Sequence, residues 1–240
     1  MASWTRMPVF RLTESLKFPP CHYAEPDGLL AVGGDLSIRR LLLAYRMGIF
    51  PWYSDDMPIL WWSPDPRLVL FPGELKVSSS LRRTIRKHLF RITCDQAFRH
   101  VITQCAKVRE RTGEGTWLVP EMIEAYCHLH LQGHAHSVES WLDGELVGGL
   151  YGVALGRVFF GESMFSLRSD ASKVALVQLV QWLQQWDYEL IDCQVRTEHL
   201  KRFGAREIPR PIFLTLVKQG VDREPNPLAW AFASGVDDHD

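Results

Sequence analysis

The sequence predicts a mixed α/β fold, with a small N-terminal domain over residues 1–66 and a larger domain over residues 67–240. Two different sequence patterns, one before residue 67 and one after it, support this prediction. Before residue 67, glycine, proline and aromatic residues interrupt every apolar run, so only short elements fit. From Arg67 onward, apolar runs of strand length alternate with segments of helical periodicity, which is typical of a sheet covered by helices. A chain of 240 residues is long enough for this division.

The clearest element in the first third is a helix from Ser37 to Gly48. Ser37 can cap the first turn, and Gly48 can end the helix in a left-handed conformation. A loop from Ile49 to Arg67 follows, in which five aromatic residues stand among four prolines. Prolines hold the backbone in extended or turn conformations, so this loop offers large flat rings on a stiff support. Within it, Trp61 and Trp62 stand at the start of a predicted strand and are expected to lie in the core.

The larger domain is predicted to alternate strands and helices. Strands are expected at "RLVLF", "FRITC", "HSVESWL", "ELVGGLYGVAL", "RVFFGESMF" and "ELIDCQV", with a hairpin turn near Gly156. Helices are expected in "SSSLRRTIRKH", "DQAFRHVITQCAKV", "PEMIEAYCHLHLQG", "DASKVALVQLVQWLQQW", "TEHLKRFG" and "IFLTLVKQG". Asp95 is the expected cap of the second helix, and Pro120 and Gly133 mark the two ends of the third. The tail from Val221 is polar and expected to be peripheral.

Composition excludes several classes of protein. The net charge is −1, so an anionic partner has to be met by a local patch. No apolar run reaches the roughly 18 residues of a membrane span, and the N-terminus lacks the apolar centre of a signal peptide, so a cytoplasmic protein is expected. The five cysteines form no CxxC pair and are expected to be free thiols. The histidines from His128 to His136 lack a companion cluster, so no metal site is predicted.

Three polar residues stand out because they interrupt apolar strands. Asp192 and Gln194 are two positions apart, so a strand would place both on one face. A carboxylate and a carboxamide are costly in such a strand unless they are partnered or used in chemistry. Glu162 lies in "FFGESMF", where alternation aligns it with Phe160 and Met164. The alternatives are a buried hydrogen-bonded pair for the first two residues and a rim position at a strand end for Glu162.

A run of cations without an intervening acid lies between Glu74 and Asp95. On a helix, its members stack one turn apart and could contact a phosphate backbone, or they could simply form a solvated face. The residues concerned are Arg82, Arg83, Arg86 and Lys87. The chain has no GxxxxGK[ST] phosphate loop and no strand–GxGxxG–helix unit, so no nucleoside triphosphate or nicotinamide cofactor is predicted.

Several motifs together resemble one enzyme family, the bacterial leucyl/phenylalanyl-tRNA–protein transferases. They run from about Gly28 to Pro211, and they are long, ordered and unusual. The motifs are "GLLAVGGDLS", "LLLAYRMGIFPWYS", "PILWWSPDPR", "EGTWLVPEMIEAYCHLHLQGHAHSVE", "LVGGLYGV", "FGESMFS", "ASKVAL", "LIDCQV" and "EIPR". The resemblance implies a small N-terminal domain joined to an acyl-CoA N-acyltransferase-like domain. It also implies transfer of Leu or Phe, less readily Met, from aminoacyl-tRNA to the N-terminal Arg or Lys of a protein, which then enters the N-degron degradation route.

The resemblance also assigns roles to residues. It implies contact with the terminal adenosine of the tRNA by Tyr45, Trp52, Trp117 and Tyr126, where stacking on the aromatic loop would be worth about 1–3 kcal/mol per base. It places the aminoacyl side chain in an apolar pocket near Leu150, Phe159, Met164, Leu176, Leu179 and Ile191. It assigns the chemistry to Asp192, Gln194 and Glu162.

The expected reaction needs no metal, ATP or other cofactor, because an aminoacyl ester is already activated. We expect Asp192 to orient Gln194 and attract the incoming ammonium, Gln194 to position amine and carbonyl, and Glu162 to contact the acceptor N-terminus or the aminoacyl amine. Two other functions remain open on the sequence: an acetyl-CoA N-acetyltransferase and a module that sequesters tRNA ends. The first is disfavoured because "SMFSLRSDAS", before the matching helix, has no glycine for a pyrophosphate turn. A monomer is expected.

Overall fold

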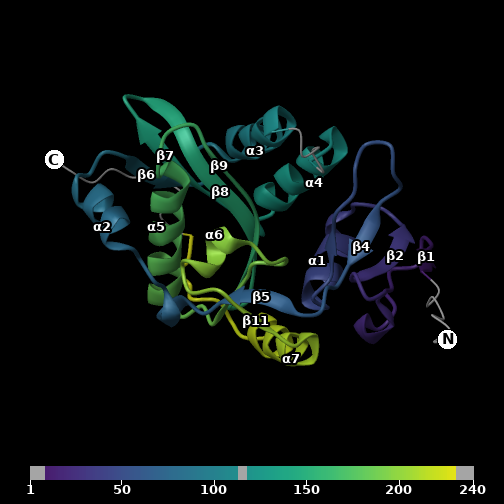
Figure 1. Ribbon diagram of the computed structural model, residues 1–240. Coiled ribbons are helices and arrows are strands. Elements are labelled where there is room, and N and C mark those ends of the chain that lie inside the picture. Colours follow the sequence, from purple (N-terminus) through teal and green to yellow (C-terminus); the bar gives the residue numbers. More distant parts are fainter. Residues whose placement is uncertain (1–8, 113–117, 231–240) are drawn as a thin grey trace, which may run out of the picture.

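The computed structural model of the protein describes residues 9–112 and 118–230 (Figure 1). Trp117, expected to contact adenosine, lies outside the described residues. The predicted mixed α/β class is confirmed, with two separate sheets and helices on both faces of the larger one. The first sheet uses residues 10–62, and the second begins at Arg67.

The N-terminal unit is a four-stranded sheet with one helix beside it. Its strands follow the order β1-β2-β4-β3, with β1 parallel to β2 and the other neighbours antiparallel. Their bounds are β1 Phe10–Leu12, β2 Leu29–Gly33, β3 Phe50–Pro51 and β4 Leu60–Trp62, with a 3-10 turn, η1, at Cys21–Tyr23. Helix α1 spans Ile38–Arg46, and the Ser37 side chain accepts from the Arg40 backbone N–H as predicted. Gly48 follows with a φ of 70°, which confirms the predicted stop.

The larger unit is built on a seven-stranded sheet in the order β11-β5-β10-β9-β8-β7-β6. Its strands are β5 Arg67–Leu70, β6 Arg91–Cys94, β7 Ala135–Leu142, β8 Glu145–Leu155, β9 Val158–Ser166, β10 Leu190–Asp192 and β11 Arg206–Ile208. All neighbouring pairs are antiparallel except β9 and β10, which are parallel. Parallel neighbours need a crossover connection, and here it is the helix α5.

Helices cover the larger sheet on both faces. They are α2 Ser79–Arg86, α3 Phe98–Thr112, α4 Pro120–Leu131, α5 Ala171–Gln185, α6 Glu198–Lys201 and α7 Arg210–Val221, with a 3-10 turn, η2, at Pro72–Glu74. One apolar cluster joins α3 and α4 to the sheet, and a second cluster joins α5 to the opposite face. Successive side chains of β8 alternate between the two clusters: Leu150 lies in the cluster on the α5 side, and Tyr151 lies in the cluster on the α3 side.

The first of these clusters extends into the N-terminal unit. It contains Leu41 and Trp61 from that unit together with Phe160 of β9 and Phe213 of α7, all buried. Trp61 is therefore a core residue, as predicted, while Trp62 is only half-buried. Because the two sheets share this core, a domain boundary at residue 66 would separate two units that pack against each other. We keep that boundary as a proposal.

Two local predictions are wrong. Asp95 does not cap α3, which begins three residues later, at Phe98. Its carboxylate instead accepts from the Ser137 N–H and contacts Nδ1 of His136 at 2.7 Å. Asp95 therefore links the end of β6 to β7. The tail is not wholly peripheral either, because the ring of Trp230 stacks on His136 with centroids 3.9 Å apart.

Candidate active site

A cavity opens where β9 and β10 separate. The two strands pair in register from Leu190 opposite Val158 to Asp192 opposite Phe160, and β10 then ends while β9 continues. The gap holds a cavity of about 260 Å³. Ligand sites form preferentially at such openings, because side chains from several elements converge there without filling the space.

One end of this cavity is apolar, and it is formed by the residues that we expected to hold the aminoacyl side chain. All six line it, from β8, β9, α5 and β10: Leu150, Phe159, Met164, Leu176, Leu179 and Ile191. Gly152 makes room for the ring of Phe159, since a Cβ atom at Gly152 would lie 2.5 Å from that ring. The structure thus brings the predicted pocket together, and its role in binding stays a prediction.

The polar end of the cavity begins with Glu162, which a β-bulge positions. Tyr151 pairs with Ser163 and Gly152 pairs with Gly161, so Glu162 has no partner opposite it. A bulge reverses the alternation of side chains. Phe160 and Glu162 consequently face the α4 side, while Met164 faces the α5 side. The expected alignment of Glu162 with Met164 is wrong for this reason.

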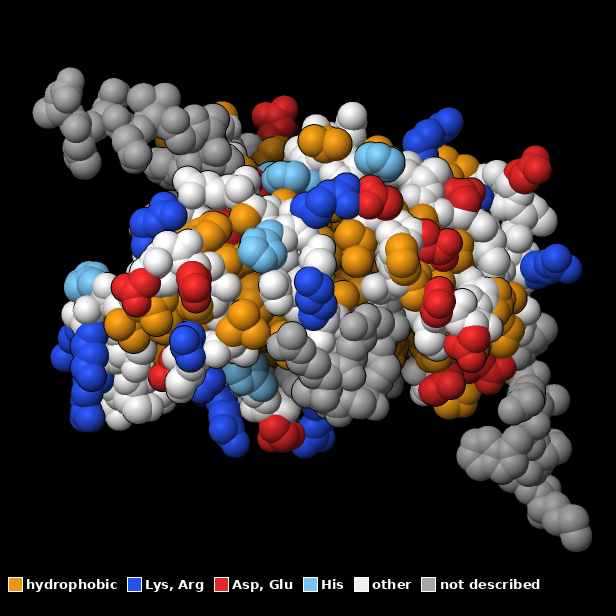
Figure 2. All heavy atoms as spheres, turned by 90° about the horizontal axis from the view of Figure 1, so that it is seen from above, with side chains coloured by type: hydrophobic (Ala, Val, Ile, Leu, Met, Phe, Trp, Pro, Cys, Tyr) orange, Lys and Arg blue, Asp and Glu red, His pale blue; other side chains and the backbone are white. Residues whose placement is uncertain are grey.

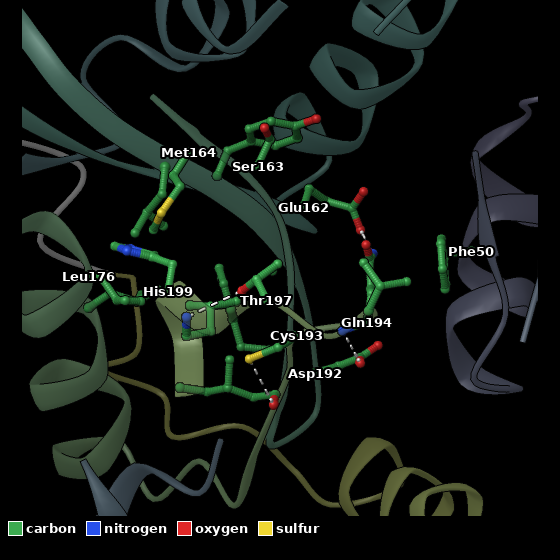
Figure 3. Close-up of a pocket in the computed structure, with 18 of the residues that line it drawn as sticks. Phe50, Glu162, Ser163, Met164, Leu176, Asp192, Cys193, Gln194, Thr197 and His199 are labelled. Carbon is green, nitrogen blue, oxygen red and sulfur yellow. Dashed lines mark hydrogen bonds between the residues drawn. The ribbon is translucent and has the colours of Figure 1, made fainter. Parts of the chain in front are cut away.

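The Glu162 carboxyl is enclosed by three donors from different elements. The hydroxyl of Tyr45 on α1 lies 2.8 Å from Oε1, and the hydroxyl of Tyr126 on α4 lies 2.9 Å from Oε2. The side-chain amide nitrogen of Gln194 donates to Oε1 at 2.8 Å (Figure 3). Glu162 is 7% exposed, and burial raises its pKa to about 7, although the hydrogen bonds from the tyrosines lower it.

The burial of the two tyrosines changes the interpretation of their role. Tyr45 is 1% exposed and Tyr126 is 0% exposed, so neither ring face can stack on a base in this structure. The expected stacking on adenosine therefore does not fit these two residues, which instead donate to Glu162. Trp52 differs, because 41% of it is exposed and it lines the mouth of the cavity.

Asp192 is paired with a cation that the sequence analysis missed. The guanidinium of Arg67 donates from Nε and Nη2 to the two carboxylate oxygens at 2.8 and 2.7 Å, and both side chains are buried. The guanidinium also lies between the rings of Phe50 and Phe213, at 4.7 and 4.6 Å from their centroids. A buried arginine opening the apolar strand "RLVLF" was the available signal, because such a charge requires a buried acid elsewhere.

Gln194 lies beyond the end of β10 rather than on a strand face with Asp192. Its backbone is left-handed, with a φ of 62°, although its carbonyl still accepts from the Leu68 N–H of β5. The predicted alignment by strand alternation is therefore wrong, because alternation requires extended backbone. The two residues are still in contact, because the Gln194 N–H donates to Oδ1 of Asp192 at 2.9 Å. Figure 3 shows Gln194 between Glu162 and Asp192, with Phe50 facing the group from the N-terminal unit.

The orientation of the Gln194 amide follows from its partner. Since its nitrogen donates to Glu162, its oxygen is the acceptor that remains. Within the described residues, no hydrogen bond reaches that oxygen. This oxygen can therefore accept a hydrogen bond from a ligand, for example from an amine N–H.

The predicted basic helix is α2, and its cations face solvent. Arg82, Arg83, Arg86 and Lys87 are all exposed, and none forms an ion pair with another described residue. Figure 2 shows Lys and Arg side chains gathered along the end of the molecule at which Figure 1 places α2. The geometry is compatible with a backbone contact to a nucleic acid, and the role stays a prediction.

Other candidate groups lead elsewhere. All five cysteines are free thiols. In the part of the chain that the structure describes, no three His, Cys, Asp or Glu residues are placed to hold a metal ion together. No helix of residues 9–112 or 118–230 is long and apolar enough to cross a membrane.

The fold and the cavity define a class of protein: a mixed α/β protein with a cavity that is apolar at one end and carries a carboxyl and a carboxamide at the other. Comparison with known proteins specifies the class further. The model of the leucyl/phenylalanyl-tRNA protein transferase family matches residues 69–218, and the model of the N-terminal domain of that family matches residues 34–65. The chain belongs to this family and is a transferase.

Individual relatives agree over nearly the whole length. A leucyl/phenylalanyl-tRNA–protein transferase of Syntrophobacter fumaroxidans is 64% identical over 224 residues, which are 93% of this chain and 96% of the relative. Those of an Anaeromyxobacter species and of Desulforapulum autotrophicum are 60% and 55% identical, and the matches cover 95% and 94% of this chain and 97% and 99% of the relatives.

Proposed function

We propose that the enzyme transfers leucine or phenylalanine, and less readily methionine, from aminoacyl-tRNA to the N-terminal Arg or Lys of acceptor proteins, which marks them for N-degron degradation. The observation that carries the proposal is one cavity whose apolar end leads directly to Glu162, Gln194 and Asp192. Such a cavity suits an aminoacyl ester, which has an apolar side chain on one side and a reactive carbonyl and an amine on the other.

The apolar end accounts for the range of donors. A pocket of this kind separates side chains that differ by one methylene by only about 1–3 kcal/mol, so related large apolar side chains are all accepted. Met164, half-buried in the wall, adds a flexible side chain that adapts to Leu, Phe or Met. Small side chains leave part of the pocket unfilled and bind less well.

The polar end accounts for the chemistry. The acceptor amine attacks the ester carbonyl, the new C–N bond forms, the bond to the ribose oxygen breaks, and the proton lost by the amine passes to that oxygen. The free oxygen of Gln194 accepts from the amine N–H and so aligns the amine. Glu162 contacts the acceptor or donor amine.

Asp192 has a supporting role in this scheme. Because Arg67 compensates its charge, it does not attract the incoming ammonium as we expected from the sequence. Its Oδ1 instead holds the backbone N–H of Gln194, and this fixes the carboxamide beside the carbonyl.

The donor tRNA would be held outside the cavity. The exposed ring of Trp52 at the mouth offers a stacking surface for an unpaired base of the 3′ end. The cations of α2 would contact the phosphate backbone. We infer further that the reaction needs no metal or other cofactor, because the aminoacyl ester is already activated. We also propose that the enzyme acts in the cytoplasm and as a monomer.

A transfer assay tests the proposal. Purified protein is mixed with labelled Leu-tRNA and a peptide that starts with Arg, without ATP, metal or coenzyme A, and label in the peptide is measured. A matched peptide that starts with Ala is the control. We expect label in the Arg peptide only. Binding of tRNA without any transfer would contradict the proposal and favour a module that sequesters tRNA ends, and tight binding of acetyl-CoA would favour an acetyltransferase.

A further inference from the structure

The two buried tyrosines beside Glu162 have no role in the scheme above. Their hydroxyls contact each other at 2.5 Å, and each also contacts one oxygen of the Glu162 carboxyl. Tyr45 comes from the N-terminal unit and Tyr126 from α4, so this triangle joins three separate parts of the chain. No ligand reaches the hydroxyls directly, because both rings are buried. Any influence that they have on the reaction therefore passes through Glu162.

The number of protons in this triangle depends on the state of Glu162. Three oxygen–oxygen contacts close the triangle, and the two hydroxyls supply only two protons. With Glu162 ionised, one contact lacks a proton and two lone pairs face each other. With Glu162 protonated on Oε2, each contact has one proton: Glu162 donates to Tyr126, Tyr126 to Tyr45, and Tyr45 to Oε1. Gln194 donates to Oε1 in both states.

Opposing influences act on the same carboxyl. Burial and the nearby Asp192 carboxylate raise the pKa of Glu162, and the hydroxyls of Tyr45 and Tyr126 and the Gln194 amide lower it, which leaves it at about 7. The guanidinium of Arg67 forms its ion pair with Asp192 and not with Glu162. Among the described residues, further titratable groups near this corner are Tyr151 of β8, whose ring meets that of Tyr126 edge-on, and Cys193, which lines the same cavity. Without the hydroxyls, a carboxyl so deeply buried would stay protonated well above neutral pH.

We propose that Tyr45 and Tyr126 are positioning residues that hold Glu162 between its protonated and ionised states, so that it exchanges one proton with the amine of a substrate in the cavity. The proposal rests on the proposed function for the identity of that amine. The exchange balances: the proton leaves the ammonium nitrogen, adds to a Glu162 oxygen, and leaves a neutral amine with a free electron pair. The hydroxyl protons then redistribute within the triangle, and no oxidant or further reactant is needed.

The test measures the protonation of Glu162 in the free protein. The infrared band of a protonated carboxylic acid is titrated, and the band that disappears in Glu162→Gln is assigned to this residue. We expect a midpoint near 7 in the wild type. In Tyr45→Phe and in Tyr126→Phe, the midpoint should rise by about one pH unit, because the hydrogen bond lost to the charged form outweighs the relief of the contact that lacks a proton.

A matched control separates this effect from general packing. Tyr188→Phe removes another buried hydroxyl, one that accepts from Nε1 of Trp230 and does not touch Glu162, so the midpoint should not move. The rising limb of the transfer rate should shift by the same amount in the two test variants and recover at high pH. An unchanged infrared midpoint in a folded Tyr45→Phe or Tyr126→Phe protein would overturn the proposal. If the midpoint shifts but the wild type transfers no amino acid, the proposed function fails and the assignment of the hydroxyls stands.

Discussion

At the scale of single residues, the site is organised by charges whose partners are distant in sequence. Arg67 and Asp192 form a buried bidentate pair, and Asp192 uses the same oxygen, Oδ1, to hold the backbone of Gln194. A buried pair of this kind contributes little net stability compared with apolar residues, but losing one member leaves an uncompensated charge. The pair is therefore better explained by the geometry that it imposes on Gln194 than by stability.

A pair of variants separates these two contributions. Asp192→Leu alone should lower the free energy of unfolding by about 3–5 kcal/mol, because Arg67 is left buried without its acid. The double variant Arg67→Met/Asp192→Leu should recover most of that loss in urea denaturation. Transfer activity should stay low in both, because the Gln194 N–H has lost its acceptor. A double variant with wild-type transfer would show that the contact to Gln194 is dispensable.

At the scale of elements, the bulge in β9 and the glycines of β8 create the cavity. The bulge directs Glu162 toward the tyrosines, and Gly152 on the neighbouring strand leaves room for the ring of Phe159. A strand of regular alternation with larger side chains would pair fully and close the space. The predicted pocket thus depends on the backbone geometry of β8 and β9 as well as on the side chains that line it.

The variant Gly152→Ala tests this dependence. The new Cβ atom would lie 2.3 Å from the carbonyl oxygen of Phe160 and 2.5 Å from the ring of Phe159, so backbone or ring must move. Overpacking of this kind costs about 1–3 kcal/mol. We expect a lower urea midpoint together with a raised KM for Leu-tRNA. Gly73→Ala is the control, since its Cβ meets nothing within 4 Å, and equal behaviour of the two variants would contradict the argument.

Much of the element pattern could be predicted from local sequence, and the exceptions have physical reasons. The helix limits near Ser37, Gly48 and Pro120 follow from capping chemistry, which acts within one turn. Strand alternation failed at Glu162, because a bulge is decided by pairing with a neighbouring strand. It failed at Gln194 as well, because its left-handed backbone is not indicated by the residue type. The pairing of Arg67 with Asp192 is nonlocal and leaves no periodic signal.

The exposed helix α2 supplies a test of nucleic-acid contact. Arg83→Ala/Lys87→Ala should weaken binding similarly for every tRNA and lower the slope of log affinity against log salt by about one unit per lost contact. Lys107→Ala/Lys218→Ala, which removes two exposed cations of α3 and α7 that form no ion pair with another described residue, is the matched control and should leave the slope unchanged. A fluorescence titration with deacylated tRNA at several salt concentrations measures both. An unaltered slope in the α2 variant would show that these cations face solvent and do not contact the tRNA backbone.

At the scale of the whole molecule, the N-terminal unit completes the site as well as the core. Phe50 covers Arg67, Trp52 borders the cavity mouth, and Tyr45 reaches Glu162. The apolar cluster that contains Leu41 and Trp61 continues without interruption into the larger sheet. An independent N-terminal unit would leave that cluster open to water and would take these three residues away from the site.

This continuity predicts cooperative unfolding of both units. Tryptophan fluorescence and far-ultraviolet circular dichroism should give coincident urea transitions, as expected for two-state behaviour. Leu41→Ala removes a side chain that is 0% exposed and should lower the free energy of unfolding by about 2–5 kcal/mol. The loss should move the single transition as a whole, because the cavity forms in a core that both sheets share. Two separate transitions in this variant, with the larger sheet unfolding at the wild-type midpoint, would show that the units are energetically independent and that Tyr45 reaches Glu162 only through a weak interface.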